Sequence, residues 1–209
     1  MGAGRTFFTV AYRIGLHPWE GAAKNQEYAE KFAQLLDREE DGLEPPFGRA
    51  LDIGCGSGVW GVELARRGWA VTGVDIVEKA VRRARGRARE AGVDAGFVHG
   101  DVTDLGAADV GSGFRLLLDT GTFHALTDAQ RTAMGREITA VASPDATLLM
   151  AVWAPMNRGP LPRGATRLEV ATAFPRWRIT DTVASMLEPP PLMRRLKADE
   201  HWYRLRRRT

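Results

Sequence analysis

The sequence predicts an α/β fold in which a doubly wound, mostly parallel sheet is covered by helices. Short apolar runs alternate with helical segments throughout residues 48–155. A glycine-rich turn joins the first of these runs to the first helix, and acidic residues stand where several strands should end. Alternation of this kind implies right-handed crossovers and a sheet with both faces covered. The 209 residues are enough for one domain with a sizeable core.

An N-terminal helical cap is expected over residues 1–47. The segment 21–40 places large apolar side chains at helical spacing, namely Tyr28, Phe32, Leu35 and Leu36. Glycine and prolines at 41–46 then interrupt the helix and form a loop.

The core at 48–155 contains the alternating elements. We expect strands at 49–53, 69–75, 95–99, 114–119 and 146–153, and helices at 59–67, 77–91 and 127–141. Gly68 and Gly92 directly follow the first two of these helices, and glycine is a common helix terminator.

The C-terminal part, residues 156–209, is harder to interpret. It predicts a loop at 156–164, a short helix at 167–173, and strands at 177–183 and 201–205. The last two strands would form an antiparallel hairpin that closes the edge of the sheet. The three prolines at 189–191 are too few to mark a domain boundary. We therefore expect one domain over residues 1–209.

Composition and charge favour an ordinary soluble protein of the cytoplasm. Hydrophobic residues make up 44% and charged residues 26%, and the net charge is +3. The basic clusters at 82–87 and 204–208 favour solvated faces or a loose terminus over a nucleic-acid site. We see no signal peptide and no apolar run long enough to span a bilayer. Cys55 is the only cysteine, which excludes an intrachain disulfide and a zinc site with several cysteines.

The most informative segment is the glycine turn at 54–58, which carries Gly54, Gly56 and Gly58 between a strand and a helix. Glycine lets a backbone turn tightly and approach a ligand closely. In open α/β sheets, ligands bind outside the carboxyl ends of the strands. Residues 56–61 also fit the Gly-x-Gly-x-x-Gly pattern of dinucleotide sites, and that pattern alone is a weak signal.

Charge separates the candidate ligands. A dinucleotide would place a negatively charged pyrophosphate on this turn, where Asp52 would repel it, and residues 52–61 contain no Lys or Arg. S-adenosyl-L-methionine instead carries an ammonium and a sulfonium group. Two unit charges ~4 Å apart interact by roughly 4 kcal/mol at an effective dielectric constant near 20. The acidic residue therefore favours S-adenosyl-L-methionine.

Further acids follow the next strands. Asp75 is placed to accept hydrogen bonds from both ribose hydroxyls. Asp101 is placed to accept one from the adenine amine, with Ile76 or Val102 against the ring. Purely structural alternatives remain open: Asp75 as a helix cap, Asp101 in an Asx turn, and the glycines as parts of a tight turn.

Over 48–155 the chain resembles class I S-adenosylmethionine-dependent methyltransferases, on its glycine motif and on the acids after the second and third strands. The resemblance implies the Rossmann-like methyltransferase fold, with S-adenosyl-L-homocysteine as product. It implies cofactor contacts at Asp52, Gly54, Cys55, Gly56, Gly58, Asp75, Ile76, Asp101, Val102 and the backbone around Asp119. The stretches 18–20 and 119–124 resemble the branch with thiopurine- and tellurite-type methyltransferases and small quinol or hydroxyquinoline O-methyltransferases.

Methyl transfer is a direct displacement, so such an enzyme mainly aligns its reactants. His124, just past the fourth strand, is the candidate catalytic base, because a histidine pKa of about 6.5 suits a phenol or thiol proton. The alternative is a structural histidine. Candidate substrate-pocket residues are Tyr12, His17, Trp19 and Trp153, each of which could instead serve packing. Closure of residues 7–24 over the cofactor is a further hypothesis.

The expected acceptor is a small molecule with an aromatic or heteroaromatic hydroxyl or thiol. Residues 119–122 lack the prolines of methyltransferases that act on amino groups of nucleic acids, which disfavours such a substrate. No metal site is expected, including around Asp119, His124 and Asp128. We expect a monomer or homodimer. The alternatives are an NAD(P)-dependent Rossmann oxidoreductase, or a non-catalytic cofactor- or RNA-binding protein that uses residues 82–89 and the basic tail.

Overall fold

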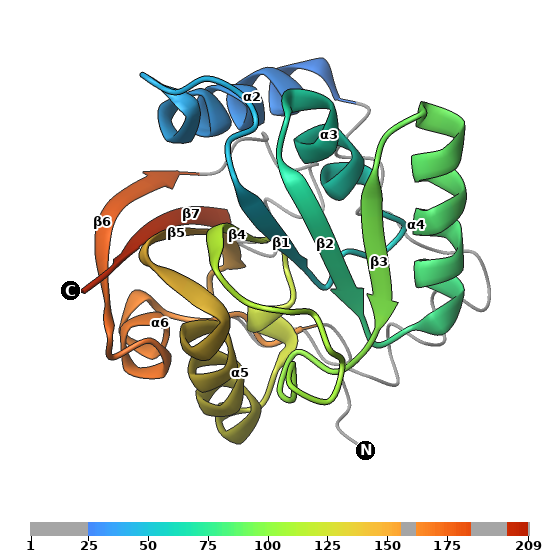
Figure 1. Cartoon of the computed structure of the whole chain (residues 1–209). Coiled ribbons are helices and arrows are strands. Elements are labelled where there is room, and N and C mark those ends of the chain that lie inside the picture. The colour runs from blue at the N-terminus through green and yellow to red at the C-terminus, as the bar shows by residue number, and fades with distance from the viewer. Residues whose placement is uncertain (1–24, 156–161, 185–199, 209) are drawn as a thin grey trace.

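A computed structural model describes residues 25–155, 162–184 and 200–208 (Figure 1). Seven strands form one sheet in the order β3-β2-β1-β4-β5-β7-β6. The strands are β1 (Arg49–Ile53), β2 (Ala70–Asp75), β3 (Ala95–His99), β4 (Phe114–Asp119), β5 (Ala142–Trp153), β6 (Trp177–Ala184) and β7 (Glu200–Arg207). Neighbours from β3 to β5 are parallel, and β7 runs antiparallel to both β5 and β6. The predicted fold class, with its antiparallel C-terminal pair, is confirmed.

Helices cover both faces of this sheet. On one face lie α2 (Gln26–Glu40), α3 (Val59–Arg67) and α4 (Glu78–Ala91), and on the other lie α5 (Asp128–Val141) and α6 (Arg167–Ala173) (Figure 1). A short 3-10 helix, η2 (Phe123–Ala125), follows β4. Among the described helices, none is long and apolar enough to cross a membrane.

The helix α2 is the described part of the predicted cap. Asn25 begins it by accepting the Tyr28 N–H at 3.0 Å. Its apolar side, which includes Tyr28 and Phe32, packs on side chains of the sheet. At its other end, the buried Glu39 carboxylate pairs with Arg204 of β7 and accepts the Thr147 hydroxyl at 2.8 Å. The helix is therefore fastened to the sheet along its length.

The opposite face is closed by α5, α6 and a loop. Gly135 lets the two helices approach, because a Cβ at that position would lie 1.9 Å from the carbonyl oxygen of Ala173. Beside β1 and β2, the cover is the segment 100–113, which contains no helix and places Val102, Leu105 and Val110 in the core.

Two expectations need correction. β5 begins at Ala142 rather than at 146, because Phe114 and Leu116 of β4 pair with Ala142 and Thr147, which leaves the residues between them in a bulge. Proline is tolerated at such a bulge, so Pro144 does not prevent the strand. In addition, residues 204–207 are not a loose terminus: they belong to β7, which is hydrogen-bonded to a strand on each side.

Candidate active site

The site lies at the carboxyl edge of the parallel strands. Strand order reverses between β1 and β4, and ligands bind at such switch points in open α/β sheets. Three carboxyl groups gather at this edge, and the exposed fractions of Asp52, Asp75 and Asp119 are 1%, 8% and 0%. Buried carboxylates are costly unless they are paired or serve a ligand, so the partners of each acid indicate its role.

The glycine turn is shaped by contacts from two sides. Gly54, Gly56 and Gly58 all have positive φ, at 65°, 53° and 75°. A Cβ at Gly54 would lie 1.8 Å from Thr122 Oγ1, and one at Gly58 would lie 2.8 Å from the Cβ of Ala84. The turn therefore fits closely between the loop after β4 and helix α4, and the three glycines leave it without side chains.

Arg87 of α4 supports the turn from outside. Its Nε donates to the Ser57 carbonyl oxygen at 2.9 Å, and its Nη2 donates to Ser57 Oγ at 3.3 Å. Cys55 lies within the turn, and burial raises the pKa of its thiol well above the usual value. That shift disfavours the thiolate, which is the nucleophilic form of a cysteine.

Asp75 joins the end of β2 to the glycine turn. Its Oδ2 accepts the Gly56 N–H at 2.9 Å, and its Oδ1 accepts the Val77 N–H at 2.7 Å. Burial raises the pKa of this carboxyl, while the two N–H groups lower it. Asp75 thus links the end of β2 to the glycine turn and to the residue before α4. It does not cap the helix, because the N-cap of α4 is Val77 and no side chain caps it.

Asp52 differs from the other acids because, within the described residues, neither of its carboxylate oxygens has a hydrogen-bond partner. It lies under the first turn of α3, where a Cβ added to Gly61 would be 3.0 Å from Oδ2. Burial raises its pKa to about 7, and the charges of Asp75 and Asp119 raise it further. The Gly61 N–H lies near enough to lower this pKa, but its geometry does not make a hydrogen bond. This acid lacks a cationic neighbour and would be stabilised by a cationic ligand.

Asp119 and Asp101 are held in local structure. Asp119 Oδ1 accepts the Gly121 and Thr122 N–H groups at 2.9 and 2.6 Å, and Oδ2 accepts the Phe123 N–H at 3.0 Å. Burial raises the pKa of Asp119 to about 6, and these N–H groups lower it. Asp101 Oδ1 accepts the Thr103 N–H and hydroxyl at 2.9 and 2.7 Å, which is an Asx turn. The backbone after β4 is therefore fixed by a side chain.

The apolar candidates Ile76 and Val102 flank this acidic edge differently. Val102 is 6% exposed and packs in the core, whereas Ile76 is half-buried, and its carbonyl oxygen lies 3.1 Å from His99 Nε2. The half-buried Ile76 side chain is therefore the more accessible of the two to a ligand ring.

On the acceptor side, the structure brings His124 and Trp153 together. Their rings stack with centroids 4.8 Å apart and an interplanar angle of 11°. His124 is 5% exposed, and its Nδ1 accepts the backbone N–H of Trp153 at 3.3 Å. In a neutral imidazole, a nitrogen that accepts an N–H leaves the hydrogen on the other nitrogen. In this arrangement His124 presents a donor rather than the lone pair that a base needs. The candidates Tyr12, His17 and Trp19 lie outside the described residues.

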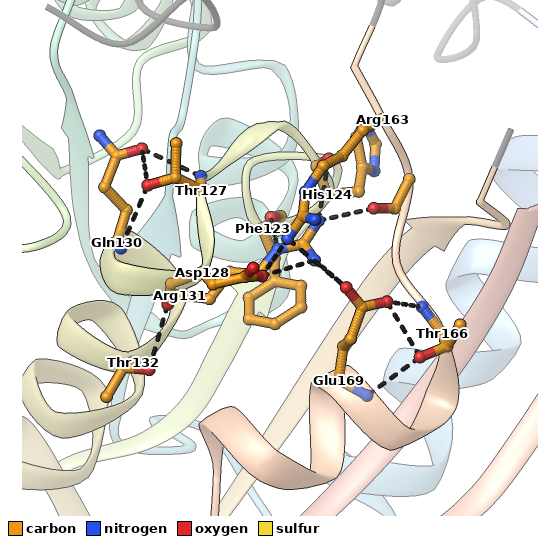
Figure 2. A network of polar contacts seen from close by, with 11 residues as sticks. Phe123, His124, Thr127, Asp128, Gln130, Arg131, Thr132, Arg163, Thr166 and Glu169 are labelled. Carbon is orange, nitrogen blue, oxygen red and sulfur yellow. Dashed lines mark hydrogen bonds and ion pairs between the residues drawn. The ribbon is translucent and has the colours of Figure 1, made fainter. Parts of the chain in front are cut away.

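A buried arginine, Arg131, makes hydrogen bonds to the segment that contains His124 (Figure 2). Arg131 of α5 is 2% exposed. It donates to the carbonyl oxygens of Phe123 at 3.2 Å, His124 at 3.3 Å and Gly164 at 2.6 Å, and to Glu169 Oε1 at 2.8 Å. Its guanidinium carbon also lies 5.0 Å from the ring centre of Phe123. Arg131 therefore fixes η2 and the segment before α6 relative to each other.

Part of the chain matches a known protein family. Residues 50–145 match the family described as a methyltransferase domain. Over 70 residues, the chain is 40% identical to a ubiquinone biosynthesis O-methyltransferase of Xanthomonas axonopodis pv. citri, covering 34% of this chain and 29% of that protein. A second protein of that name, from Xanthomonas euvesicatoria pv. vesicatoria, is 31% identical over 109 residues, covering 42% and 46%. The alignments thus span less than half the length of these relatives.

Solved structures share the fold over nearly the whole chain. The 1,6-didemethyltoxoflavin-N1-methyltransferase of Burkholderia thailandensis, with bound 1,6-didemethyltoxoflavin and S-adenosylhomocysteine, has a TM-score of 0.73 at 22% identity and covers 99% of this chain and 88% of its own. The magnesium protoporphyrin IX methyltransferase of Synechocystis PCC 6803, with bound S-adenosylmethionine, has a TM-score of 0.72 at 18% identity and covers 98% and 97%.

Residues 50–145 carry a methyltransferase domain. The structural neighbours are crystallised with S-adenosylmethionine or S-adenosylhomocysteine, and the residues of this methyltransferase domain fit that cofactor. The glycine turn leaves room for a ligand, and the acid beneath it, Asp52, has no partner among the described residues and would attract a cation. The same acid would repel a pyrophosphate.

Three residues near the site were not predicted from the sequence. They are Arg87, Arg131 and Glu200, and Glu200 is described below. Arg87 and Arg131 make contacts 30 and 33 positions away in the chain, to Ser57 and Gly164. The sequence carries no signal for either pairing, because arginines are common on solvated helix faces. A buried position on α5 is visible only once α6 is packed against it.

The ionisation of Asp52 predicts a pH dependence of cofactor affinity. A cationic ligand favours the charged form of Asp52, whose pKa in the free domain is about 7. Affinity for S-adenosylmethionine should therefore rise by about 5- to 10-fold between about pH 6 and pH 8. Titration calorimetry across this range measures the effect. In Asp52→Asn the rise should disappear, because the amino group of the ligand loses charge towards pH 8 and cannot raise the affinity. An equal rise in both proteins would contradict the role of Asp52.

Proposed function

We propose that this protein transfers the methyl group of S-adenosylmethionine to a hydroxyl or thiol of a small aromatic or heteroaromatic molecule. The observation that carries the proposal is the carboxylate of Asp52, which has no hydrogen-bond partner in the part of the chain that the structure describes and lies beneath a glycine turn at the switch point of the sheet. A buried charge in this position needs a cation. The stacked pair His124–Trp153 lies at the same edge, past the ends of β4 and β5.

Residues of the chain would hold the cofactor as follows. Asp75 accepts the ribose hydroxyls, Asp101 accepts the adenine amine, and Ile76 or Val102 lies against the ring. The backbone after Asp119, which its own carboxylate fixes, borders the position of the methyl group. When bound, S-adenosylmethionine supplies a methyl carbon that its sulfonium group activates. The chain contributes alignment, which is the main requirement of a direct displacement.

The acceptor side supports a flat, ring-containing acceptor. His124 and Trp153 stack and present an aromatic surface, and ring–ring contacts of this kind hold planar ligands. The named relatives include O-methyltransferases of ubiquinone biosynthesis, and the named acceptors of the structural neighbours are ring compounds. These names support an aromatic hydroxyl as the first class to test.

Two assays test the proposal on the full-length chain. Calorimetry should give micromolar binding of S-adenosylmethionine and S-adenosylhomocysteine and no comparable binding of NADH. Transfer of tritium from labelled S-adenosylmethionine should then be detected on catechols or thiophenols. Preferential binding of NADH would contradict the proposal and favour an oxidoreductase. Binding of RNA with a steep salt dependence, without binding of either adenosyl ligand, would favour an RNA-binding protein.

A further inference from the structure

An acid that no sequence pattern indicated stands on the acceptor side of the site. β7 runs antiparallel to β5, so its first residue, Glu200, lies at the edge where β4 and β5 end. In the register of the two strands, Glu200 is paired with Trp153, whose ring stacks on His124. A carboxylate is therefore placed next to the aromatic pair proposed to bind the acceptor.

Two indole side chains hold the Glu200 carboxylate. Trp202 Nε1 donates to Glu200 Oε1 at 2.9 Å, and the Trp153 side chain also hydrogen-bonds to it. The Trp202 ring in turn lies beside Tyr28 of α2, with ring centroids 6.3 Å apart. Glu200 is only partly buried, so a small molecule in the site can reach it. The carboxylate is thus oriented by neutral donors and remains accessible.

The surroundings of Glu200 favour proton acceptance. The titratable groups near it in the described elements are Tyr28 on α2 and His124 across Trp153. His201 follows it in β7 and points to the opposite face of the sheet, beside Tyr203. Burial raises the pKa of Glu200 above its ordinary value, and the two indole N–H groups lower it. A base works best when its pKa approaches the working pH. The Glu200 charge also raises the pKa of the Tyr28 phenol, which keeps Tyr28 protonated.

We propose that Glu200 is the base on the acceptor side: its carboxylate accepts the hydrogen bond of the acceptor hydroxyl or thiol and takes that proton during methyl transfer. The inference rests on the proposed function, and it assigns to Glu200 the role that the sequence suggested for His124. In the step, the acceptor oxygen or sulfur forms a bond to the methyl carbon. The bond from that carbon to the sulfonium sulfur breaks, and its electron pair stays on the sulfur. The acceptor proton moves to Glu200.

The first experiment compares wild type with Glu200→Gln, which keeps an oxygen to accept the indole N–H groups but cannot take a proton. Two acceptor probes are used at about pH 8, catechol and 4-nitrocatechol, because the nitro group lowers the hydroxyl pKa so that this probe is already ionised. Loss of a general base costs about 10²- to 10⁴-fold. We expect at least a 100-fold loss with catechol and less than about a 3-fold loss with 4-nitrocatechol.

A matched control is Glu78→Gln, since Glu78 is exposed on α4 and pairs with Arg82. It should leave both rates unchanged. Equal losses with the two probes in Glu200→Gln would indicate a structural role and overturn the proposal. No loss with catechol, or a wild-type protein that binds S-adenosylmethionine yet methylates neither probe, would overturn it as well.

A second readout needs no acceptor. Ionisation of Glu200 should change the fluorescence of Trp153 and Trp202, which both hydrogen-bond to it. We expect a transition with a midpoint above the usual glutamate pKa in wild type and in His124→Gln, and its loss in Glu200→Gln. A transition that persists in Glu200→Gln would contradict the assignment. Failure of wild type to bind S-adenosylmethionine would instead contradict the proposed function, while this transition would still report on Glu200.

Discussion

Replacement of Asp75 with alanine should weaken the binding of S-adenosylmethionine by roughly 100-fold or more. A hydrogen bond to a charged group contributes about 1.5–3 kcal/mol, and two ribose hydroxyls would lose this acceptor. The substitution also leaves the Gly56 and Val77 N–H groups without their present partner. The glycine turn would then lose its side-chain link to β2 and keep only the hydrogen bond from the Cys55 N–H to the Val74 carbonyl oxygen. Calorimetry on the folded variant measures the dissociation constant directly.

The matched control is Asp94→Ala, because Asp94 is an exposed acid between α4 and β3. Its affinity for S-adenosylmethionine should equal that of wild type. The affinity of Asp75→Asn for S-adenosylmethionine should lie between those of wild type and Asp75→Ala, since one acceptor oxygen remains. If Asp75→Ala binds the cofactor as tightly as wild type, the position of the ribose proposed here is wrong.

Replacement of Arg131 with leucine should lower the free energy of unfolding by about 3–4 kcal/mol, since breaking a buried ion pair is costly and unpartnered buried acceptors add to the cost. The carbonyl oxygens of His124 and Gly164 would lose the arginine donor. The Phe123 carbonyl oxygen would keep the Leu126 N–H, and Glu169 would keep Arg163. Burial lowers the pKa of Arg131, which shows that desolvation already opposes its charge. Urea unfolding followed by circular dichroism measures the change.

Arg136→Leu is the control for this effect. Arg136 lies on the same helix, its side chain is 71% exposed, and it pairs only with the neighbouring Glu137 among the described residues. Its substitution should change the free energy of unfolding by less than about 0.5 kcal/mol. Similar unfolding curves for the two variants would show that the network of Figure 2 contributes little to stability.

The elements of the core could be predicted from the sequence because their signals are local. Strands β1, β3 and β4, helix α3 and helix α6 have the predicted bounds, and Gly68 and Gly92 end their helices with positive φ. The start of β5 could not be predicted, since Pro144 and Asp145 are typical of turns and the strand continues through them only because a bulge removes the need for regular pairing.

The site was only partly predictable. Acids at strand ends follow from topology, because the carboxyl ends of parallel strands meet at one edge. Their hydrogen-bond partners, which decide whether an acid is satisfied, depend on three-dimensional contacts. Glu200 could not be found by the search for strand-end acids, since it begins a strand that runs in the opposite direction. His124 was found, but the backbone N–H that occupies its Nδ1 comes from another strand.

The reactivity of the buried cysteine in the glycine turn depends on local opening of that turn. Cys55 is the only thiol in the sequence, it is 8% exposed, and burial disfavours its thiolate. The thiolate is the nucleophile that attacks a modifying reagent, so labelling occurs only in molecules whose turn has opened. Regions of a protein open with their own free energies, well below that of global unfolding in mobile parts. The rate of thiol labelling in native buffer therefore reports how often the glycine turn opens, and the measurement uses a cysteine that the chain already contains.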